Sequence, residues 1–206
     1  AHSFMFKHNN KYYIYNTKRG DKAKFLFNLN NHASHIEFNK QNDKCAYTID
    51  NNLYVVNNDN HHINISNEEN KNIIFGHPVH RYEFGIYKGT FWSNDGDQLA
   101  FYHKDESMVT DYPLMKIDSR LGSSDMIKYP MAGMSSHHVL LGVYNFTTNK
   151  TIYINTGEPK EQYLTNISWG PNDIYIYIAV LNRDQNHLKF NQYSATDGSF
   201  VKTLFE

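Results

Sequence analysis

The sequence predicts an all-β fold, a partial β-propeller of about four blades of a larger propeller, with a long insertion in one blade. Two observations carry this prediction. Short runs of aromatic and β-branched residues alternate with Asn, Asp and Gly, which is typical of strands joined by tight turns. A hairpin unit also recurs along the chain. Of the 206 residues, 16 are Tyr and 13 are Phe, and so high an aromatic content argues against disorder.

The strand signals are apolar runs of four to eight residues, each bounded by residues that favour turns. The expected strands lie at 12–15, 53–56, 99–102, 139–144, 151–154 and 174–181. The expected turns lie at Asn9-Asn10, Arg19-Gly20-Asp21, Asn51-Asn52, Asn94-Asp95-Gly96, Pro171-Asn172-Asp173 and Asp197-Gly198. No long amphipathic helix is evident, so the chain is expected to consist of strands throughout.

The repeated unit is an apolar-x-aromatic strand, a polar turn of about five residues and a second apolar strand. Its aromatic anchors are Phe38, Trp92 and Trp169. Strand and turn at this spacing are typical of propeller blades, and the anchors are expected to pack in the core. A plain blade needs roughly 40 to 45 residues, so the longer intervals between anchors must hold insertions. The alternative is a β-sandwich whose hairpins are similar by chance.

Composition excludes several classes of protein. The 20 Lys and Arg against 21 Asp and Glu give a net charge of −1, which argues against a nucleic-acid partner bound through bulk charge. No apolar run is long enough for a membrane-spanning helix. The single cysteine, Cys45, excludes an intrachain disulfide and is expected to be a small buried residue.

The twelve histidines do not predict a metal site. The adjacent pairs His61-His62 and His137-His138 would point to opposite faces of a strand. The spacing His-Glu-x-x-His is absent. Neither a metal nor another cofactor is expected.

Several segments resemble a known family, with their order and spacing kept from about residue 36 to 206. They lie at 51–56, 79–86, 89–93, 105–107, 129–133 and 181–186. Tyr129-Pro130-Met131-Ala132-Gly133, for example, resembles the family's Tyr-Pro-x-Ala-Gly. The chain resembles the N-terminal β-propeller region of the dipeptidyl peptidase IV group of the prolyl oligopeptidase family, bacterial members above all.

The resemblance implies a protein larger than this chain. Family members pair an eight-bladed propeller with an α/β-hydrolase domain, so residues 1–206 are expected to be a propeller fragment without the hydrolase domain. The chain lacks the nucleophile motif Gly-x-Ser-x-Gly. Ser135-Ser136-His137-His138 lacks the strand-turn-helix setting of a nucleophile, so no catalytic residue is expected here.

The function that the resemblance implies belongs to the longer protein. That protein is expected to be a secreted or periplasmic serine dipeptidyl aminopeptidase. The fragment would bind the substrate N-terminus and gate access to the catalytic domain, and it would be inactive alone. The alternative is a non-enzymatic propeller-like module that binds a peptide or protein.

The family binds the free N-terminus of a peptide with acidic residues of the propeller. The matching stretch here is Tyr82-Glu83-Phe84, with Arg81 beside it; Glu83 fits the second of two family glutamates and Tyr82 replaces the first. A carboxylate can hold a peptide ammonium at a fixed distance from a nucleophile. We expect Glu83 to bind the ammonium, Tyr82 to accept a hydrogen bond from it, and Arg81 to position Glu83 or bind a substrate carbonyl. The alternative is that Glu83 and Arg81 are solvated loop residues.

The insertion covers about residues 106–133. In the family the corresponding extension is an arm that helps to form the homodimer, and a homodimer is expected here too. Its apolar contact surface would consist of Met108, Val109, Tyr112, Leu114, Met115 and Ile117. The alternative is a flap that folds back on its own blade.

For two further pairs of charged residues the sequence allows two roles each. Asp105 and Glu106 are either loop acids or a second anchor for the substrate. Arg183 and Asp184 form either an internal ion pair or a turn.

Overall fold

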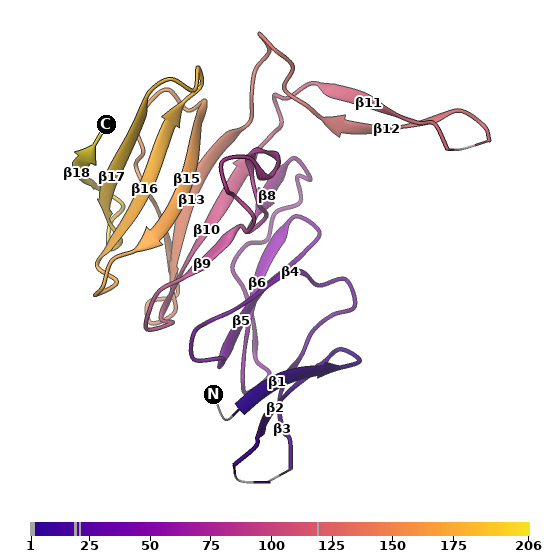
Figure 1. Ribbon diagram of the computed structural model, residues 1–206, viewed down its shortest axis with the longest axis vertical. Coiled ribbons are helices and arrows are strands. Elements are labelled where there is room, and N and C mark those ends of the chain that lie inside the picture. Colours follow the sequence, from indigo (N-terminus) through magenta and orange to yellow (C-terminus); the bar gives the residue numbers. More distant parts are fainter. Residues whose placement is uncertain (1–2, 19, 21, 119) are drawn as a thin grey trace.

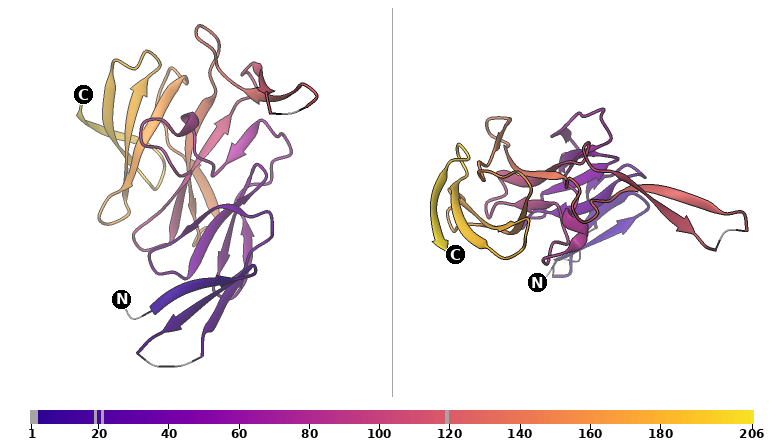
Figure 2. Two further views of the ribbon diagram at one scale, coloured as in Figure 1. Left: turned by 45° about the vertical axis from the view of Figure 1, so that its right-hand side comes forward. Right: turned by 90° about the horizontal axis from the view of Figure 1, so that it is seen from above.

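The structure is a computed structural model, which describes residues 3–18, 20, 22–118 and 120–206. The described residues form antiparallel sheets joined by turns and loops (Figure 1). The sheets follow one another along the chain and lie side by side, as the blades of a propeller do (Figure 2). The predicted all-β partial propeller is therefore confirmed. The turn expected at Arg19-Gly20-Asp21 lies partly outside the described residues.

Four sheets make up the blades, which we number in chain order. Blade 1 contains β1 (Ser3–His8), β2 (Lys11–Asn16) and β3 (Lys24–Asn28). Blade 2 contains β4 (Ser34–Phe38), β5 (Lys44–Ile49), β6 (Asn52–Asn57) and β7 (His62–Asn64). Blade 3 contains β8 (Ile73–Phe75), β9 (Thr90–Trp92), β10 (Gln98–Asp105), β13 (His138–Asn145) and β14 (Lys150–Tyr153). Blade 4 contains β15 (Gln162–Trp169), β16 (Tyr175–Asn182), β17 (Leu188–Ser194) and β18 (Phe200–Phe205).

The three repeated hairpins of the sequence are the β4–β5, β9–β10 and β15–β16 pairs. The second strands of blades 2 and 3, β5 and β10, are buried on both faces because a neighbouring blade covers each side. In β5, for example, Cys45, Ala46, Tyr47 and Thr48 are all buried. The burial of Cys45 agrees with the sequence, and burial raises the pKa of its thiol.

Each interface between neighbouring blades has its own hydrophobic core. Between blades 1 and 2 it contains Phe27 and Val56, and between blades 2 and 3 it contains Leu53 and Phe101. The core between blades 3 and 4 is the largest of the three. Its fully buried members include Tyr102, Leu141, Leu164, Ile176, Ile178 and Tyr193.

The turns that begin β5, β10 and β16 lie at one end of the blades, which we call the turn rim (residues 39–43, 93–97 and 170–173). Here the indole N–H of Trp92 donates to the Glu37 carbonyl at 3.1 Å, and that of Trp169 donates to the Phe91 carbonyl at 3.0 Å. Both indoles are only partly buried. The tryptophans therefore do more than pack in the core as predicted. Each also forms one hydrogen bond to the preceding blade, Trp92 to blade 2 and Trp169 to blade 3.

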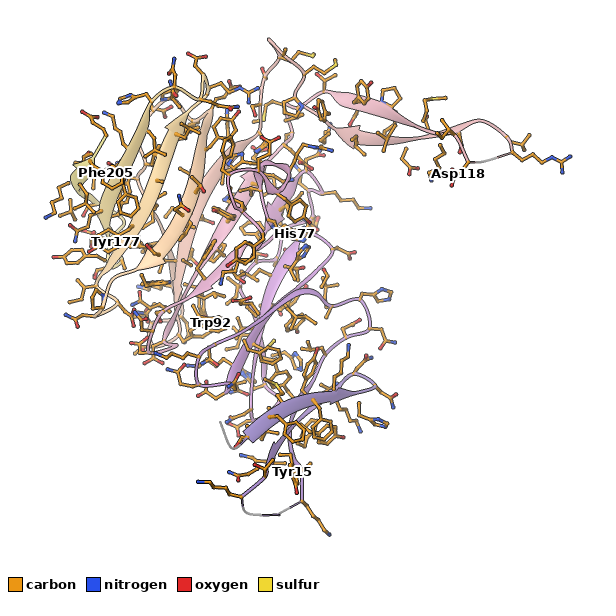
Figure 3. The ribbon with its side chains drawn as sticks, viewed as in Figure 1. Tyr15, His77, Trp92, Asp118, Tyr177 and Phe205 are labelled. Carbon is orange, nitrogen blue, oxygen red and sulfur yellow. The ribbon has the colours of Figure 1, made fainter. Side chains whose placement is uncertain are left out.

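The opposite end of the blades is the loop rim (residues 77–89, 106–137 and 183–187). It carries the 3₁₀ turn η1 (His80–Tyr82) and the predicted insertion. The insertion is a two-stranded hairpin of β11 (Asp111–Lys116) and β12 (Ser123–Lys128), which we call the arm. It projects away from the blades, with Asp118 near its tip (Figures 1 and 3). The alternative, in which the insertion folds back on its own blade as a flap, is therefore wrong (Figures 1 and 3).

Candidate functional site

The loop that carries Arg81, Tyr82 and Glu83 is held at both ends and exposed between them. Val79 and Ile86, which flank it, are buried in the core between blades 3 and 4. Arg81, Tyr82 and Glu83 are exposed, Tyr82 by 64%. The loop closes on itself through the Glu83 amide, which donates to the His80 carbonyl at 3.0 Å.

The backbone of this loop is strained. Three consecutive non-glycine residues, His80, Arg81 and Tyr82, have φ values of 51°, 53° and 66°, and Phe84 has 56°. The left-handed region is unfavourable for residues with a Cβ atom, and such strain tends to gather at functional sites. The Thr165 hydroxyl helps to hold the conformation, because it donates to the Phe84 carbonyl at 2.9 Å.

Beneath the exposed residues lies a pair of buried histidines. His80 Nδ1 and His137 Nε2 are 3.0 Å apart and share a hydrogen bond. Burial, followed by the other histidine and the charges of Lys104 and Arg183, lowers the pKa of His80 to about 3. Burial and the nearby cations also lower the pKa of His137 to about 4. Both rings are therefore neutral at pH 7, and they join the loop to the end of the insertion.

A small cavity of about 160 Å³ opens beside the loop. Its walls come from η1, from the loop after the arm, from β15 and from the turn after β16. They comprise His80, Arg81, Glu83, Tyr129, Pro130, Ser136, His137, Tyr163 and Arg183. The fold thus brings Glu83 and Arg81 to one cavity, whereas Tyr82 lines a neighbouring one.

Tyr163 is the centre of the cavity wall. It is 7% exposed, and its ring centroid lies 4.8 Å from those of His80 and Phe84. Its hydroxyl lies 2.6 Å from Arg183 Nη1, which donates to it. Arg81 lies over the ring of Tyr129, 4.7 Å from its centroid.

Glu83 differs from the nearby acids Asp105 and Glu106, although within the described ranges it shares its lack of a side-chain partner with Asp184 on the same rim. Among the described residues, no side-chain hydrogen bond or ion pair involves its carboxylate. Glu106, by contrast, pairs with Lys104 at 2.6 Å, and Asp105 accepts a hydrogen bond from the Ser107 amide. Asp105, the last residue of β10, and Glu106, the loop residue after it, therefore both have partners, whereas the Glu83 carboxylate is open to a ligand.

Two site residues escaped the sequence reasoning. Tyr163 carries no motif, and its position becomes evident only when β15 packs beside η1. For Arg183 the sequence predicts an ion pair with Asp184 or a turn. It does lie next to the turn after β16, but its partner is the Tyr163 hydroxyl and not Asp184. Tyr129 belongs to the Tyr-Pro-x-Ala-Gly segment at 129–133, and this family resemblance was a signal for the cavity wall.

The arm presents most of the predicted apolar residues to solvent. Ile117 is 96% exposed, Met115 65% and Leu114 53%, and Tyr112 and Met108 are also exposed. Val109 is a correction, because it is 3% exposed at the base of the arm. The Val109 carbonyl accepts a hydrogen bond from Lys128, so this residue fixes the base and offers no contact surface.

The part of the chain that the structure describes holds no group of three His, Cys, Asp or Glu side chains placed to bind a metal ion. Within the same ranges, no helix has the length and apolar character to cross a membrane.

Comparison with known proteins places the chain in a family. Residues 2–206 match the dipeptidyl peptidase IV (DPP IV) N-terminal region. A protein of Phaeosphaeria nodorum named as a dipeptidyl-aminopeptidase B is 28% identical over 176 residues, which is 76% of this chain and 19% of that protein. The chain thus spans about a fifth of the length of this relative.

Two solved structures are similar over 98% of this chain. A protein of Bacteroides ovatus described as a dipeptidyl aminopeptidase IV is 44% identical, with a TM-score of 0.87 over 28% of its length. Porphyromonas gingivalis dipeptidyl peptidase 4 is 22% identical, with a TM-score of 0.74 over 30% of its length, and that similarity concerns the fold alone. The chain belongs to the family of dipeptidyl peptidase IV N-terminal regions.

Proposed function

We propose that this chain is part of a longer protein, the parent protein, which is a serine dipeptidyl aminopeptidase. The chain supplies blades of its propeller and binds the free N-terminus of the peptide substrate. The nucleophile would lie in a hydrolase domain outside residues 1–206. The loop rim, with its cavity, would control the approach of the substrate to that domain.

The single observation that carries this proposal is the open carboxylate of Glu83. It lines a cavity on a strained but well-anchored loop, and it forms no ion pair among the described residues, although Arg81 and Arg183 line the same cavity. A peptide ammonium paired with such a carboxylate forms a charge-assisted hydrogen bond, which is about twice as strong as a neutral one. Tyr82 lies next to Glu83 in the loop but is largely exposed, so we assign it at most a supporting contact.

Arg81 has a role separate from Glu83 in this proposal. Its guanidinium rests on Tyr129, and among the described residues it forms no ion pair with Glu83. It therefore does not hold Glu83 in place, and we propose that it contacts the substrate.

The experiment is hydrolysis of a Gly-Pro p-nitroanilide by the parent protein, with the substrate N-terminus either free or acetylated. The proposal predicts cleavage of the free-amine substrate and at least tenfold slower cleavage of the acetylated one, because acetylation removes the ammonium charge. Equal cleavage of both would contradict recognition of the N-terminus. A lack of cleavage of either would contradict the peptidase assignment.

We also propose that the parent protein is a homodimer whose arm contacts a second copy. The exposed Leu114, Met115 and Ile117 support this, since apolar side chains that project from a domain are stabilised when a partner covers them. By the resemblance to the family, the parent protein would work in the periplasm or outside the cell, which cell fractionation can test.

A further inference from the structure

The cavity beside Glu83 carries an excess of positive charge. Arg81 and Arg183 line it together with the single carboxylate of Glu83. Among the described residues, neither arginine forms an ion pair with an acid. Arg183 uses one N–H on the Tyr163 hydroxyl. Since a guanidinium has five N–H donors, most of its hydrogen-bonding capacity remains open.

Both guanidinium groups are held in place before any ligand arrives. Arg81 lies 4.7 Å from the ring centroid of Tyr129, and Arg183 lies 5.9 Å from that of Tyr163. The hydrogen bond of 2.6 Å to the Tyr163 hydroxyl fixes Arg183 further. A fixed planar fork loses less side-chain entropy when it binds a carboxylate, and its donors match the two oxygens.

The surrounding groups do not cancel this charge. The nearest buried titratable groups, His80 and His137, stay neutral, and the charge of Arg183 contributes to lowering the pKa of both. Glu161 and Asp184 line the adjoining cavity on the other side of Arg183. Glu161 accepts a hydrogen bond from the Ser136 amide at 2.8 Å, and neither acid comes within ion-pair distance of Arg183.

The size of the cavity limits the ligand. Its volume of about 160 Å³ is below the roughly 300 Å³ at which pockets for drug-sized ligands begin. The cavity therefore suits one amino-acid residue. If that residue is neutral apart from its ammonium, the positive charge of the arginines stays unpaired on binding. A side-chain carboxylate removes this mismatch.

We propose that this cavity selects peptides whose first residue carries a side-chain carboxylate. Glu83 binds the ammonium of that residue, and Arg183, assisted by Arg81, binds its carboxylate. This inference rests on the proposed function, because it assumes that the peptide N-terminus lies at Glu83. It adds a preference for N-terminal Glu or Asp, which the position of Glu83 alone does not imply.

The test compares kcat/KM for Glu-Pro and Gln-Pro p-nitroanilides with the parent protein, since Glu and Gln differ in charge and hardly in shape. We expect Glu-Pro to be cleaved roughly five- to tenfold better, the scale of one charge-assisted contact at a half-buried site. In R183Q this ratio should fall to about 1, and in R81Q it should fall in part. R183K should keep an intermediate ratio, because it retains the charge and loses the fork.

The matched control is R120Q, which removes an exposed arginine of the arm and should leave the ratio at its wild-type value. A wild-type ratio of 1 or less would overturn the proposal. So would an unchanged ratio in R183Q, or an equal loss for both substrates in that variant, since Arg183 would then serve a feature that all peptides share. If R183Q shows a lowered thermal midpoint, its ratio could reflect a disturbed fold, and the ratios of R81Q and R183K then test the proposal instead.

A second measurement separates this inference from the proposed function. Glu-Pro amide and Gln-Pro amide are titrated into the parent protein by calorimetry, which requires no hydrolysis. Tighter binding of Glu-Pro amide that R183Q abolishes supports the arginine site even if no substrate is cleaved, and equal affinities overturn it. E83Q should weaken both dipeptides alike. Its failure to do so would contradict the role of Glu83 and leave the Glu-Pro to Gln-Pro ratio as a separate result.

Discussion

The two rims of the blades hold their residues by different means. On the turn rim the same contacts occur at successive interfaces, and polar groups find partners in the next blade. Asp173, for example, accepts hydrogen bonds from the amides of Asn94 and Asp95 at 3.0 Å each and from the Asn94 side chain at 2.6 Å. On the loop rim three consecutive residues, His80, Arg81 and Tyr82, have a left-handed backbone, whereas such residues on the turn rim, Asn42 and Asp173, stand singly. Glu83 has no side-chain partner in the described chain.

The comparison indicates that, in a fold built from repeats, the repeated contacts hold the blades together and the binding residues lie where the repeat is interrupted. A contact that recurs at every interface can specify only the stacking of blades. A binding site needs side chains that differ from blade to blade, so it forms where repetition stops. Strain and unpaired charge are tolerated there because Val79 and Ile86 anchor the loop in the core between blades 3 and 4.

The largest effect we expect is a loss of stability in mild acid that begins at the loop rim. His77, His80 and His137 all lie on this rim, with pKa values lowered to about 4, 3 and 4, mainly by burial. The unfolded chain, with an ordinary pKa near 6.5, binds more protons between about pH 6.5 and 4. Stability is therefore complete above pH 7 and falls across this window, by roughly 1.5 kcal/mol for each histidine between pH 6.5 and 5.

Urea unfolding at several pH values measures this loss, and hydrogen exchange locates it. H77Q should reduce the slope of stability against pH, whereas H8Q, at an exposed position of β1, should not. Equal loss of protection at both rims in acid would contradict the assignment to the loop rim.

The next largest effect concerns the turn rim. D173A removes a buried carboxylate and leaves the Asn94 and Asp95 amides without their acceptor, so we expect a loss of about 2 to 3 kcal/mol in the free energy of unfolding. Asp184, an exposed acid of the loop rim, supplies the control. D184A should change stability by less than about 0.5 kcal/mol. Similar losses in the two variants would remove the contrast between the rims.

A smaller effect, equal at two interfaces, is expected for the tryptophans. W92F and W169F each delete one indole N–H bond to the preceding blade, of 3.1 and 3.0 Å. We expect each to cost about 1 to 2 kcal/mol, with losses that agree within about 0.5 kcal/mol and add in the double variant. Unequal losses in denaturant midpoints would show that the two interfaces are not equivalent.

The sequence revealed the repeating part of the molecule better than the irregular part. Phe38, Trp92 and Trp169 recur in one pattern, and this pattern predicted the hairpins correctly. Glu83 was found only through family resemblance, because a lone acid in a loop has no distinctive spacing. The His80–His137 pair and the Tyr163–Arg183 contact join segments far apart in the chain, so no local pattern could predict them. Val109 was misplaced because an apolar residue at the base of a hairpin looks like one on its surface.

The smallest effect on stability is expected for the arm. Met115 and Ile117 are 65% and 96% exposed, so M115E/I117E should change the free energy of unfolding of the monomer by no more than about 0.5 kcal/mol. If the arm contacts a second copy, the same variant should shift the parent protein from dimer to monomer in sedimentation velocity. A dimer that is unaffected by both charges would rule out this surface.

The central claim, that Glu83 binds the substrate ammonium, is tested most directly by combining E83Q with N-terminal acetylation of the substrate. We predict that E83Q lowers kcat/KM for free-amine Gly-Pro p-nitroanilide by roughly five- to thirtyfold, or about 1 to 2 kcal/mol. The slow cleavage of the acetylated substrate should be the same for both proteins, since no ammonium is present to bind. An equal reduction for the two substrates, or none for either, would contradict the claim.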